Sequence, residues 1–378
     1  MSKSQIKIKF NDLDILNKKF NYQIIKELKK DFNENNFIFG KSVEKLEKKL
    51  GKFTGSKFVA TVGSGTDAIL LSLLSLNLKK GDEIIIPSFS WLSVAEVVLM
   101  LGFKPIYIDT SLVTFNMDIS LIENHITKKT KGIISTSLFG RSIDLIFIKN
   151  FCKKNKLFLI EDAAQNFGSF INKKNACNIA DLTITSFFPS KTLGCYGDGG
   201  AIFTNNSKIF KKIKYLRNHG QQKYSKSKMI GLNSRIGTIQ ATILLKKLHT
   251  LNLKIKSQKL IYLKYQNFFL KKKIGGFPLV RGKKFDDANG QFSLLVKNRT
   301  KFIKYLKIFK IPFKIYYPLP LYKQFNQKPK FSLKNTEYLC NHIISLPYNE
   351  LSQARFKKTL FFLSKIIKLN RKIFFEKN

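Results

Sequence analysis

The chain has 378 residues, 44% of them hydrophobic, which is enough for one large domain with a buried core and a smaller second domain. Its formal net charge of +44 comes from 68 basic and 24 acidic residues. Nucleic-acid binding would enrich Lys and Arg in patches, but here Lys, Ile, Asn and Phe are abundant together, including 35 Phe. Compositional bias therefore explains the charge better, and we expect no nucleic-acid partner.

The cysteines and the N-terminal residues indicate the cellular compartment in which this protein is expected. Four scattered cysteines, Cys152, Cys177, Cys195 and Cys340, form no CxxC pair and no metal-binding spacing. The first ten residues lack the apolar core of a signal peptide, and no apolar run approaches the roughly 20 residues of a membrane span. The sequence predicts a cytoplasmic protein with reduced thiols, no bound metal and no membrane insertion.

The first half of the chain alternates helical and strand-like patterns. Residues 13–50 carry apolar positions at helical spacing, with a break near 33–40. Short, almost wholly apolar runs then alternate with amphipathic segments, which is typical of an α/β fold with a mostly parallel sheet and helices on both faces. The expected strands are 58–63, 83–89, 104–110, 132–140, 156–164, 182–188 and 200–205. Such sheets bind ligands at the carboxyl ends of their strands.

The second half of the chain differs in texture. After residue 206 it becomes helical and Lys-rich, and residues 239–273 have the pattern of one long helix. Residues 275–378 contain two short strand-like runs, 291–296 and 313–318, and a helical tail. We therefore predict a large ligand-binding domain over residues 1–245, and a connector helix with a small α+β domain over 246–378.

The first predicted strand ends in Gly63-Ser64-Gly65-Thr66-Asp67, directly before a helix. Glycine lets the backbone approach an anion closely, and the helix N-terminus supplies free N–H groups. Thr66 adds a hydroxyl, so this turn can cradle a phosphate, although a plain helix cap fits the same letters. It is neither a Walker loop nor a full GxGxxG motif.

A second candidate group follows the strand that ends in Glu161-Asp162. Two acids at the end of a buried strand are costly unless they are paired or functional. A carboxylate there can keep the nitrogen of a bound pyridine ring protonated, which makes that ring a strong electron sink. The alternative, an acid that caps the next helix, fits this fragment equally well.

The third candidate is Lys191, a single lysine between aromatic residues and glycines in SFFPSKTLG. Partial burial lowers the pKa of a lysine and frees its amine for Schiff-base chemistry. A solvated surface lysine fits these apolar flanks poorly. A phosphate cradle, a strand-end carboxylate and an isolated lysine are the three attachments that pyridoxal phosphate needs, so we predict a pyridoxal-phosphate enzyme.

The segments GSGTDA, PSFSW, EDAAQ, SFFPSKTLG and YGDGGAI resemble the DegT/DnrJ/EryC1/StrS family of sugar aminotransferases. The resemblance implies the aspartate-aminotransferase-like architecture called fold-type I, and a homodimer that works with pyridoxal or pyridoxamine phosphate (PLP or PMP). It implies that Lys191 holds the cofactor and moves protons, and that Asp162 pairs with the ring nitrogen.

The resemblance also implies roles for other cofactor-binding residues. Gln165 would lie near the ring oxygen of the cofactor, and Trp91 would stack on the ring face, the alternative being a core aromatic. The phosphate would be held by Gly65, Thr66 and Ser186.

Substrate residues and the partner subunit are implied in the same way. Asn233 would reach the phosphate of the partner subunit's cofactor, and Arg235 would lie close to the substrate. Tyr316 and Tyr317 replace a common HYP segment, and Ser137 replaces a common histidine, at positions that border the sugar pocket in relatives.

The family reaction uses L-glutamate as amino donor and a UDP- or dTDP-linked keto-sugar as acceptor. The lysine loop, FFPSK followed by GCYGDGGA, resembles members that aminate a 3-keto sugar such as a UDP-2-acetamido-3-oxo-hexuronate for surface polysaccharide or O-antigen synthesis. The alternatives are a 4-keto-sugar or cyclitol aminotransferase, and a non-catalytic regulator that kept the fold.

Overall fold

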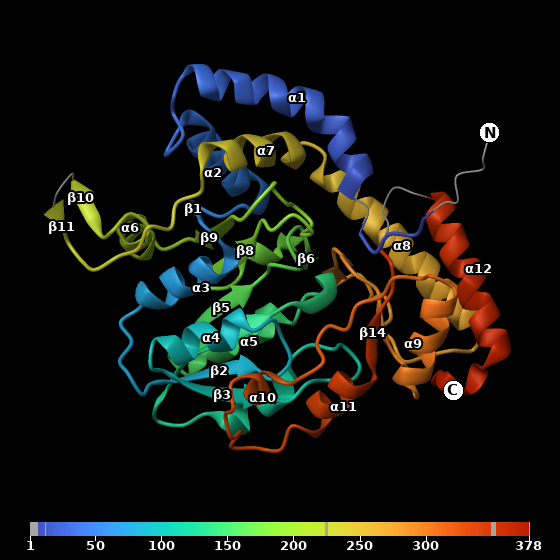
Figure 1. The fold of residues 1–378 in the computed structure, drawn as a ribbon. Coiled ribbons are helices and arrows are strands. Elements are labelled where there is room, and N and C mark those ends of the chain that lie inside the picture. The colour runs from blue at the N-terminus through green and yellow to red at the C-terminus, as the bar shows by residue number, and fades with distance from the viewer. Residues whose placement is uncertain (1–6, 12, 224–225, 349–352, 378) are drawn as a thin grey trace.

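The computed structural model describes residues 7–11, 13–223, 226–348 and 353–377. Residues 1–6, which belong to the stretch predicted to lack a signal peptide, lie outside this part. The core of the molecule is a seven-stranded sheet of order β1-β9-β8-β5-β4-β2-β3 (Figure 1). Its strands are β1 Phe58–Val62, β2 Glu83–Pro87, β3 Lys104–Ile108, β4 Thr130–Thr136, β5 Phe158–Asp162, β8 Leu182–Ser186 and β9 Gly200–Thr204.

All neighbouring strands run parallel except β9, which is antiparallel to both β1 and β8. The mostly parallel sheet predicted from the sequence is therefore confirmed. Successive residues of β2 show why its sequence is uniformly apolar. Ile84 and Ile86 pack on one face of the sheet and Ile85 packs on the other, all fully buried.

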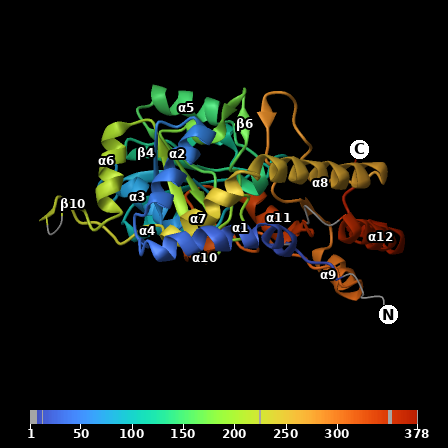
Figure 2. The same ribbon diagram turned by 90° about the horizontal axis from the view of Figure 1, so that it is seen from above.

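Helices cover both faces of this sheet (Figures 1 and 2). One apolar cluster joins α3, α4 and α6 to the face that carries Ile84, and two others join α1, α2, α5 and α7 to the opposite face. The predicted helical break near residues 33–40 is confirmed, because α1 ends at Asn33 and α2 begins at Lys41. The bounds are α1 Leu13–Asn33, α2 Lys41–Thr54, α3 Gly65–Leu74, α4 Ser93–Met100, α5 Leu145–Lys154, α6 Ser207–Leu216 and α7 Thr238–Leu248.

The predicted single helix over 239–273 is wrong, because α7 ends at Leu248 and α8 (Leu251–Lys271) begins three residues later. Thr250, at φ −111° and ψ 7°, leaves helical geometry between them. The first turns of α8 pack into the core of the sheet, and its later turns pack into a second apolar cluster. The proposed boundary between residues 245 and 246 stays a prediction.

The second cluster is built from C-terminal elements together with Ile8 from the N-terminal segment. The predicted strand at 291–296 is confirmed at its centre as β13, Ser293–Leu295, which pairs with β14, Ile343–Ser345. The strand predicted over 313–318 is wrong: only Lys314 forms a bridge there, and the following prolines interrupt strand pairing. The helices are α9 Arg299–Ile308, α10 Leu321–Gln324, α11 Lys334–His342 and α12 Gln353–Leu369.

A short hairpin that the sequence did not predict, β10 (Gln221–Lys223) with β11 (Lys226–Ser227), projects from the body beside α6 (Figure 1).

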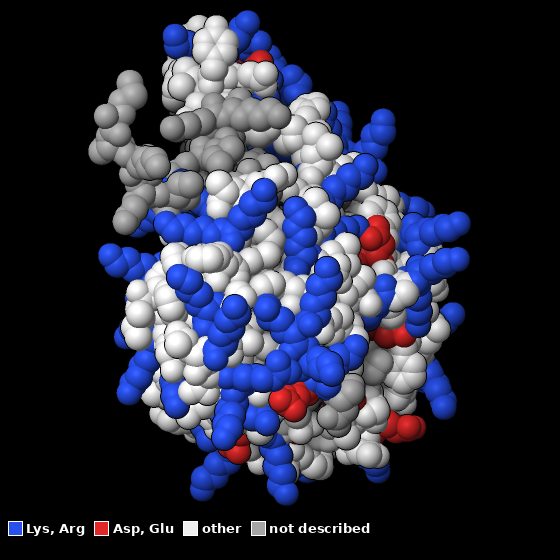
Figure 3. Space-filling view, turned by 90° about the vertical axis from the view of Figure 1, so that its right-hand side faces the viewer, with Lys and Arg blue, Asp and Glu red and all other residues white. Residues whose placement is uncertain are grey.

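On the side of the molecule that carries the C-terminal helices, Lys and Arg side chains are spread over the whole surface with few acids between them (Figure 3). No helix in the described ranges is long and apolar enough to cross a membrane.

Candidate active site

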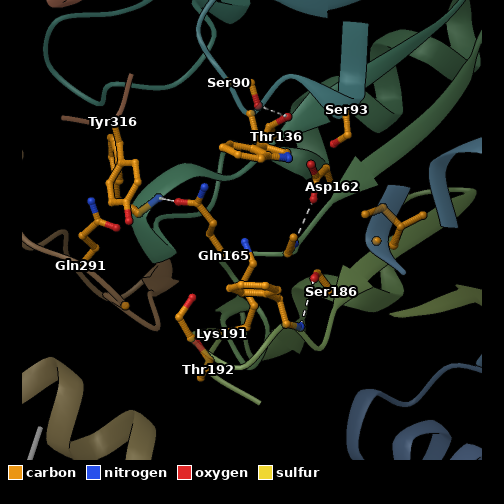
Figure 4. A pocket seen from close by; sticks show the side chains of 18 of the residues that line it. Ser90, Ser93, Thr136, Asp162, Gln165, Ser186, Lys191, Thr192, Gln291 and Tyr316 are labelled. Atoms are coloured by element: carbon orange, nitrogen blue, oxygen red, sulfur yellow. Dashed lines mark hydrogen bonds between the residues drawn. The ribbon is translucent and has the colours of Figure 1, made fainter. Parts of the chain in front are cut away.

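A cavity of about 490 Å³ opens at the carboxyl ends of β4, β5 and β8. It brings together residues that are far apart in the sequence, as parallel strands with helical connections should (Figure 4). The predicted site residues line it, with the exception of Ser137, Asn233 and Arg235. Those in the cavity are Gly65, Thr66, Trp91, Asp162, Gln165, Ser186, Lys191, Tyr316 and Tyr317.

The predicted phosphate cradle lies at the N-terminus of α3. Ser64 caps this helix by accepting a hydrogen bond of 3.0 Å from the amide of Asp67. No described acceptor takes the amide hydrogens of Gly65 and Thr66, which therefore remain available to an anion. A β-carbon on Gly65 would come within 2.9 Å of Ser186, so glycine keeps this corner open. The turn is both a helix cap and an anion cradle.

Ser234 ties a distant loop to this cradle. Its buried hydroxyl donates to Asp67 Oδ2 at 2.7 Å and accepts from the amide of Gly63 at 3.2 Å. The residues on either side, Asn233 and Arg235, do not line the cavity of their own chain. Asn233 is exposed, and Arg235 donates to Asn218 at 2.7 Å. The cradle and the loop therefore form one hydrogen-bonded unit.

Strand alternation separates the two acids at the end of β5. Asp162 faces the cavity, where it accepts a hydrogen bond of 2.9 Å from the amide of Ala164, and burial raises its pKa. Glu161 points away from the cavity and accepts hydrogen bonds from Ser135 and Ser137. Complete burial raises the pKa of Glu161 to about 8, while the hydrogen bonds from Ser135 and Ser137 oppose that shift.

Ser137 was expected near the sugar pocket, but it is fully buried beside Glu161 and does not line the cavity. That expectation is wrong because side chains of a strand point alternately to opposite faces. Ser135 opposes Glu161 and Thr136 opposes Asp162 in the paired strands. Thr136, next to Ser137 in the chain, lines the cavity instead.

Lys191 lies on a tight loop that follows β8. The loop is closed by hydrogen bonds from Cys195 N to Phe187 O (2.8 Å) and from Lys191 N to Phe188 O (2.9 Å). Burial lowers the pKa of the Lys191 amine, while the charge of Asp162 opposes that shift. No ion pair joins these two side chains in the described part of the chain. The amine is thus biased toward its neutral, nucleophilic form.

The wall of the cavity that carries Gln165, Tyr317 and Trp91 combines aromatic rings with a side-chain amide. Gln165 is fixed at both ends: its oxygen accepts from the amide of Phe139 at 2.8 Å, and its nitrogen donates to the Tyr317 hydroxyl at 2.9 Å. The ring centroids of Trp91 and Tyr317 lie 6.1 Å apart, and half of Trp91 remains exposed. A flat ring in the cavity could contact these faces.

Sequence reasoning missed several polar residues of the cavity. Thr136 is the last residue of β4 and Ser90 follows the end of β2, which was a usable signal, and the two share a hydrogen bond of 3.3 Å. Ser190 and Thr192 lie within the SFFPSKTLG segment beside Lys191, whereas Ser93 at the start of α4 and Gln291 in the C-terminal half carried no signal of their own. The missed residues include Ser90, Ser93, Thr136, Ser190, Thr192 and Gln291.

These residues fit pyridoxal phosphate. Gly65 leaves room and free amides for a phosphate at one end of the cavity, while Asp162 and Lys191 remain unpaired with each other, so that a ring can lie between them. Fold and cavity together define the class as a pyridoxal-phosphate-dependent enzyme with an α/β architecture.

Comparison with known proteins gives the same class and narrows it. The model of the DegT/DnrJ/EryC1/StrS aminotransferase family matches residues 19–359, and the chain belongs to this family. It is 37% identical, over 84% of its length and 88% of the relative, to UDP-2-acetamido-2-deoxy-3-oxo-D-glucuronate aminotransferase of Pseudomonas aeruginosa.

Two solved structures agree closely with the fold. A DegT DnrJ EryC1 StrS aminotransferase from Brucella abortus is 30% identical with a TM-score of 0.89, covering 95% of this chain and 99% of that one. The ntda protein of Bacillus subtilis, solved with bound PMP, is 29% identical with a TM-score of 0.88, covering 96% of this chain and 85% of that one. The chain is a PLP-dependent aminotransferase of the fold-type I architecture.

The tether from Ser234 to the cradle predicts a selective defect. Ser234→Ala removes the hydroxyl that holds Gly63 and Asp67, so the affinity for pyridoxal phosphate should fall about tenfold, the effect of losing one or two hydrogen bonds. The affinity for pyridoxal, which has no phosphate, should stay the same. Both are measured by absorbance titration of the cofactor-free protein, with the exposed Ser207→Ala as control. An equal loss for both ligands would contradict a role confined to the phosphate end.

Proposed function

We propose that this enzyme transfers an amino group from L-glutamate to a nucleotide-linked 3-keto sugar, with a UDP-2-acetamido-3-oxo-hexuronate as the favoured acceptor. The observation that carries the chemistry is the burial of Lys191 and Asp162 in one cavity without an ion pair between them. The choice of acceptor is supported by the relative from Pseudomonas aeruginosa, whose name specifies a 3-oxo uronate on UDP. A cytoplasmic step in surface-polysaccharide synthesis would provide such a substrate.

When bound, pyridoxal phosphate supplies an electron-withdrawing ring that stabilises negative charge on the substrate carbon. The amides of Gly65 and Thr66 and the hydroxyl of Ser186 would hold its phosphate. The Asp162 carboxylate would keep the proton on the ring nitrogen. Lys191 Nζ, with its lowered pKa, would bind the cofactor and then carry the proton between carbon atoms.

Gln165 and the aromatic wall would orient the ring. The Gln165 amide nitrogen donates one hydrogen to Tyr317 and has a second hydrogen available for an oxygen on the ring. Trp91 and Tyr317 both line the cavity, with their ring centroids 6.1 Å apart. Fixing the ring plane in this way would align the bond that breaks with the electron sink.

The active site would be completed by a second copy of the chain. Asn233 is exposed beside the cradle and does not reach its own cavity, so we propose that it contacts the cofactor phosphate in the partner subunit of a homodimer. Arg235 would then supply a cation to the substrate side of that site. The cavity of one chain is lined by a single cationic side chain among the described residues, Lys191, whereas both substrates are anionic.

The proposed role of Lys191 predicts a clear result. Lys191→Ala should abolish transfer to any keto sugar, because no other amine lines the cavity in the described part of the chain. Cofactor bound to this variant should be removed by dialysis, since only non-covalent contacts remain. Turnover is measured with L-glutamate and a panel of 3-keto and 4-keto sugar nucleotides, and Lys256→Ala, on the exposed side of α8, serves as control. Normal turnover of the Lys191 variant would disprove the assignment, and a preference for 4-keto sugars would overturn the acceptor.

The shared site predicts complementation between two inactive proteins. Lys191→Ala and Asn233→Ala homodimers should both be impaired, whereas a mixture refolded together should regain about a quarter of wild-type activity, because half of the dimers are hybrids with one intact site each. Activity is measured after mixing at equal concentration. No recovery, with hybrid dimers demonstrated by differently tagged chains, would contradict a site built from two subunits.

A further inference from the structure

Gln291 lines the cavity and lies two residues before β13, on the C-terminal half of the chain. Figure 4 shows it beside Tyr316, across the cavity from Ser186. A group at this position faces the end of the cavity where a substrate, rather than the cofactor phosphate, would lie.

Three hydrogen bonds join the side chains of Gln291, Ser293 and Ser345 in a closed triangle. The amide nitrogen lies 3.1 Å from Ser293 Oγ and 2.7 Å from Ser345 Oγ, and the two hydroxyl oxygens lie 2.8 Å apart. Ser293 and Ser345 are both buried, on the paired strands β13 and β14. Strand pairing therefore fixes the two hydroxyl groups that hold the amide.

Counting protons settles which end of the amide faces these serines. The triangle needs three donated hydrogens, and each serine has only one. If the amide oxygen faced the serines, both hydroxyl hydrogens would go to it and none would remain for the contact between Ser293 and Ser345. If the NH₂ group faces them, it donates twice and one serine donates to the other, so all three contacts are satisfied.

The Gln291 oxygen is therefore the end of the amide that is free to meet a ligand. No hydrogen bond to it is recorded from any residue in the described ranges. Because both amide hydrogens are used, Gln291 can offer a ligand only an acceptor. It can recognise a hydroxyl or an amide N–H, but it would repel a carboxylate.

We propose that Gln291 is a specificity-determining residue that accepts a hydrogen bond from a hydroxyl or acetamido N–H of the sugar acceptor. This inference rests on the proposed function. The other substrate, L-glutamate, has only its reacting amino group as a donor, and its two carboxylates are acceptors. Gln291 thus acts on the half-reaction with the sugar and leaves the half-reaction with glutamate unaffected.

The test compares the two half-reactions in Gln291→Leu, which removes the acceptor but keeps similar bulk. The rate of the single-turnover reaction with L-glutamate should stay within about twofold of wild type, while the KM for UDP-2-acetamido-3-oxo-glucuronate should rise about five- to tenfold, the effect of one lost hydrogen bond. Gln266→Leu is the matched control, because Gln266 is equally half-buried and hydrogen-bonded, to Val280 N, but does not line the cavity. An unchanged KM, or an equal slowing with glutamate, would overturn the proposal.

Binding of UDP-N-acetylglucosamine, measured by calorimetry, gives a second test of the role of Gln291 that does not depend on turnover. Its affinity should fall about fivefold in Gln291→Leu and less in Gln291→Glu, which keeps an acceptor oxygen. The pair Ser293→Ala and Ser345→Ala should also weaken binding, since the amide is then free to turn its hydrogens toward the ligand. Equal affinities in all variants, or no binding to the wild type, would contradict the role of Gln291. Failure of the glutamate reaction in the wild type would instead disprove the proposed function.

Discussion

The burial of a lysine and a carboxylate in one cavity, without an ion pair between them, is the constraint on which the rest of the structure depends. Isolated charges in a protein interior cost several kcal/mol, and a direct pair between Lys191 and Asp162 would be the simplest relief. The structure holds them apart instead, Asp162 at the rigid end of β5 and Lys191 on a loop closed by its own backbone hydrogen bonds. Burial then lowers the pKa of the amine and raises that of the carboxyl group, so both are poised to share protons with a bound ring.

Strand geometry makes this arrangement possible. Because consecutive residues of β5 point to opposite faces, Asp162 enters the cavity while Glu161 is buried on the other face, where burial raises its pKa to about 8. A second charged carboxylate next to Asp162 would compete for the proton on the ring. The hydroxyl groups of Ser135 and Ser137 satisfy Glu161 in place of a cation. Strand alternation thus directs Asp162 into the cavity and keeps the second acid, Glu161, out of it.

The parts of the molecule that the sequence could predict are those encoded in short stretches of chain. The glycine turn at Gly65, the strand ending in Asp162 and the isolated Lys191 each carry a local signal, and parallel-sheet topology brings such strand ends together. Local pattern could not reveal the break between α7 and α8, or the effect of the prolines after Tyr317. Ser234 and Gln291 were missed because their partners, such as Asp67 and Ser345, are 167 and 54 residues away. The direction in which Ser137 points depended on a strand register that only the structure defines.

The central claim is that Lys191 and Asp162 form a pyridoxal-phosphate site that reacts with an amino donor. The most direct test is the absorption spectrum of the purified protein with pyridoxal phosphate, recorded before and after addition of L-glutamate. The account predicts a visible band from cofactor linked to Lys191, which glutamate converts to a near-ultraviolet band. A protein that forms no visible band, or a band that glutamate leaves unchanged, would contradict it.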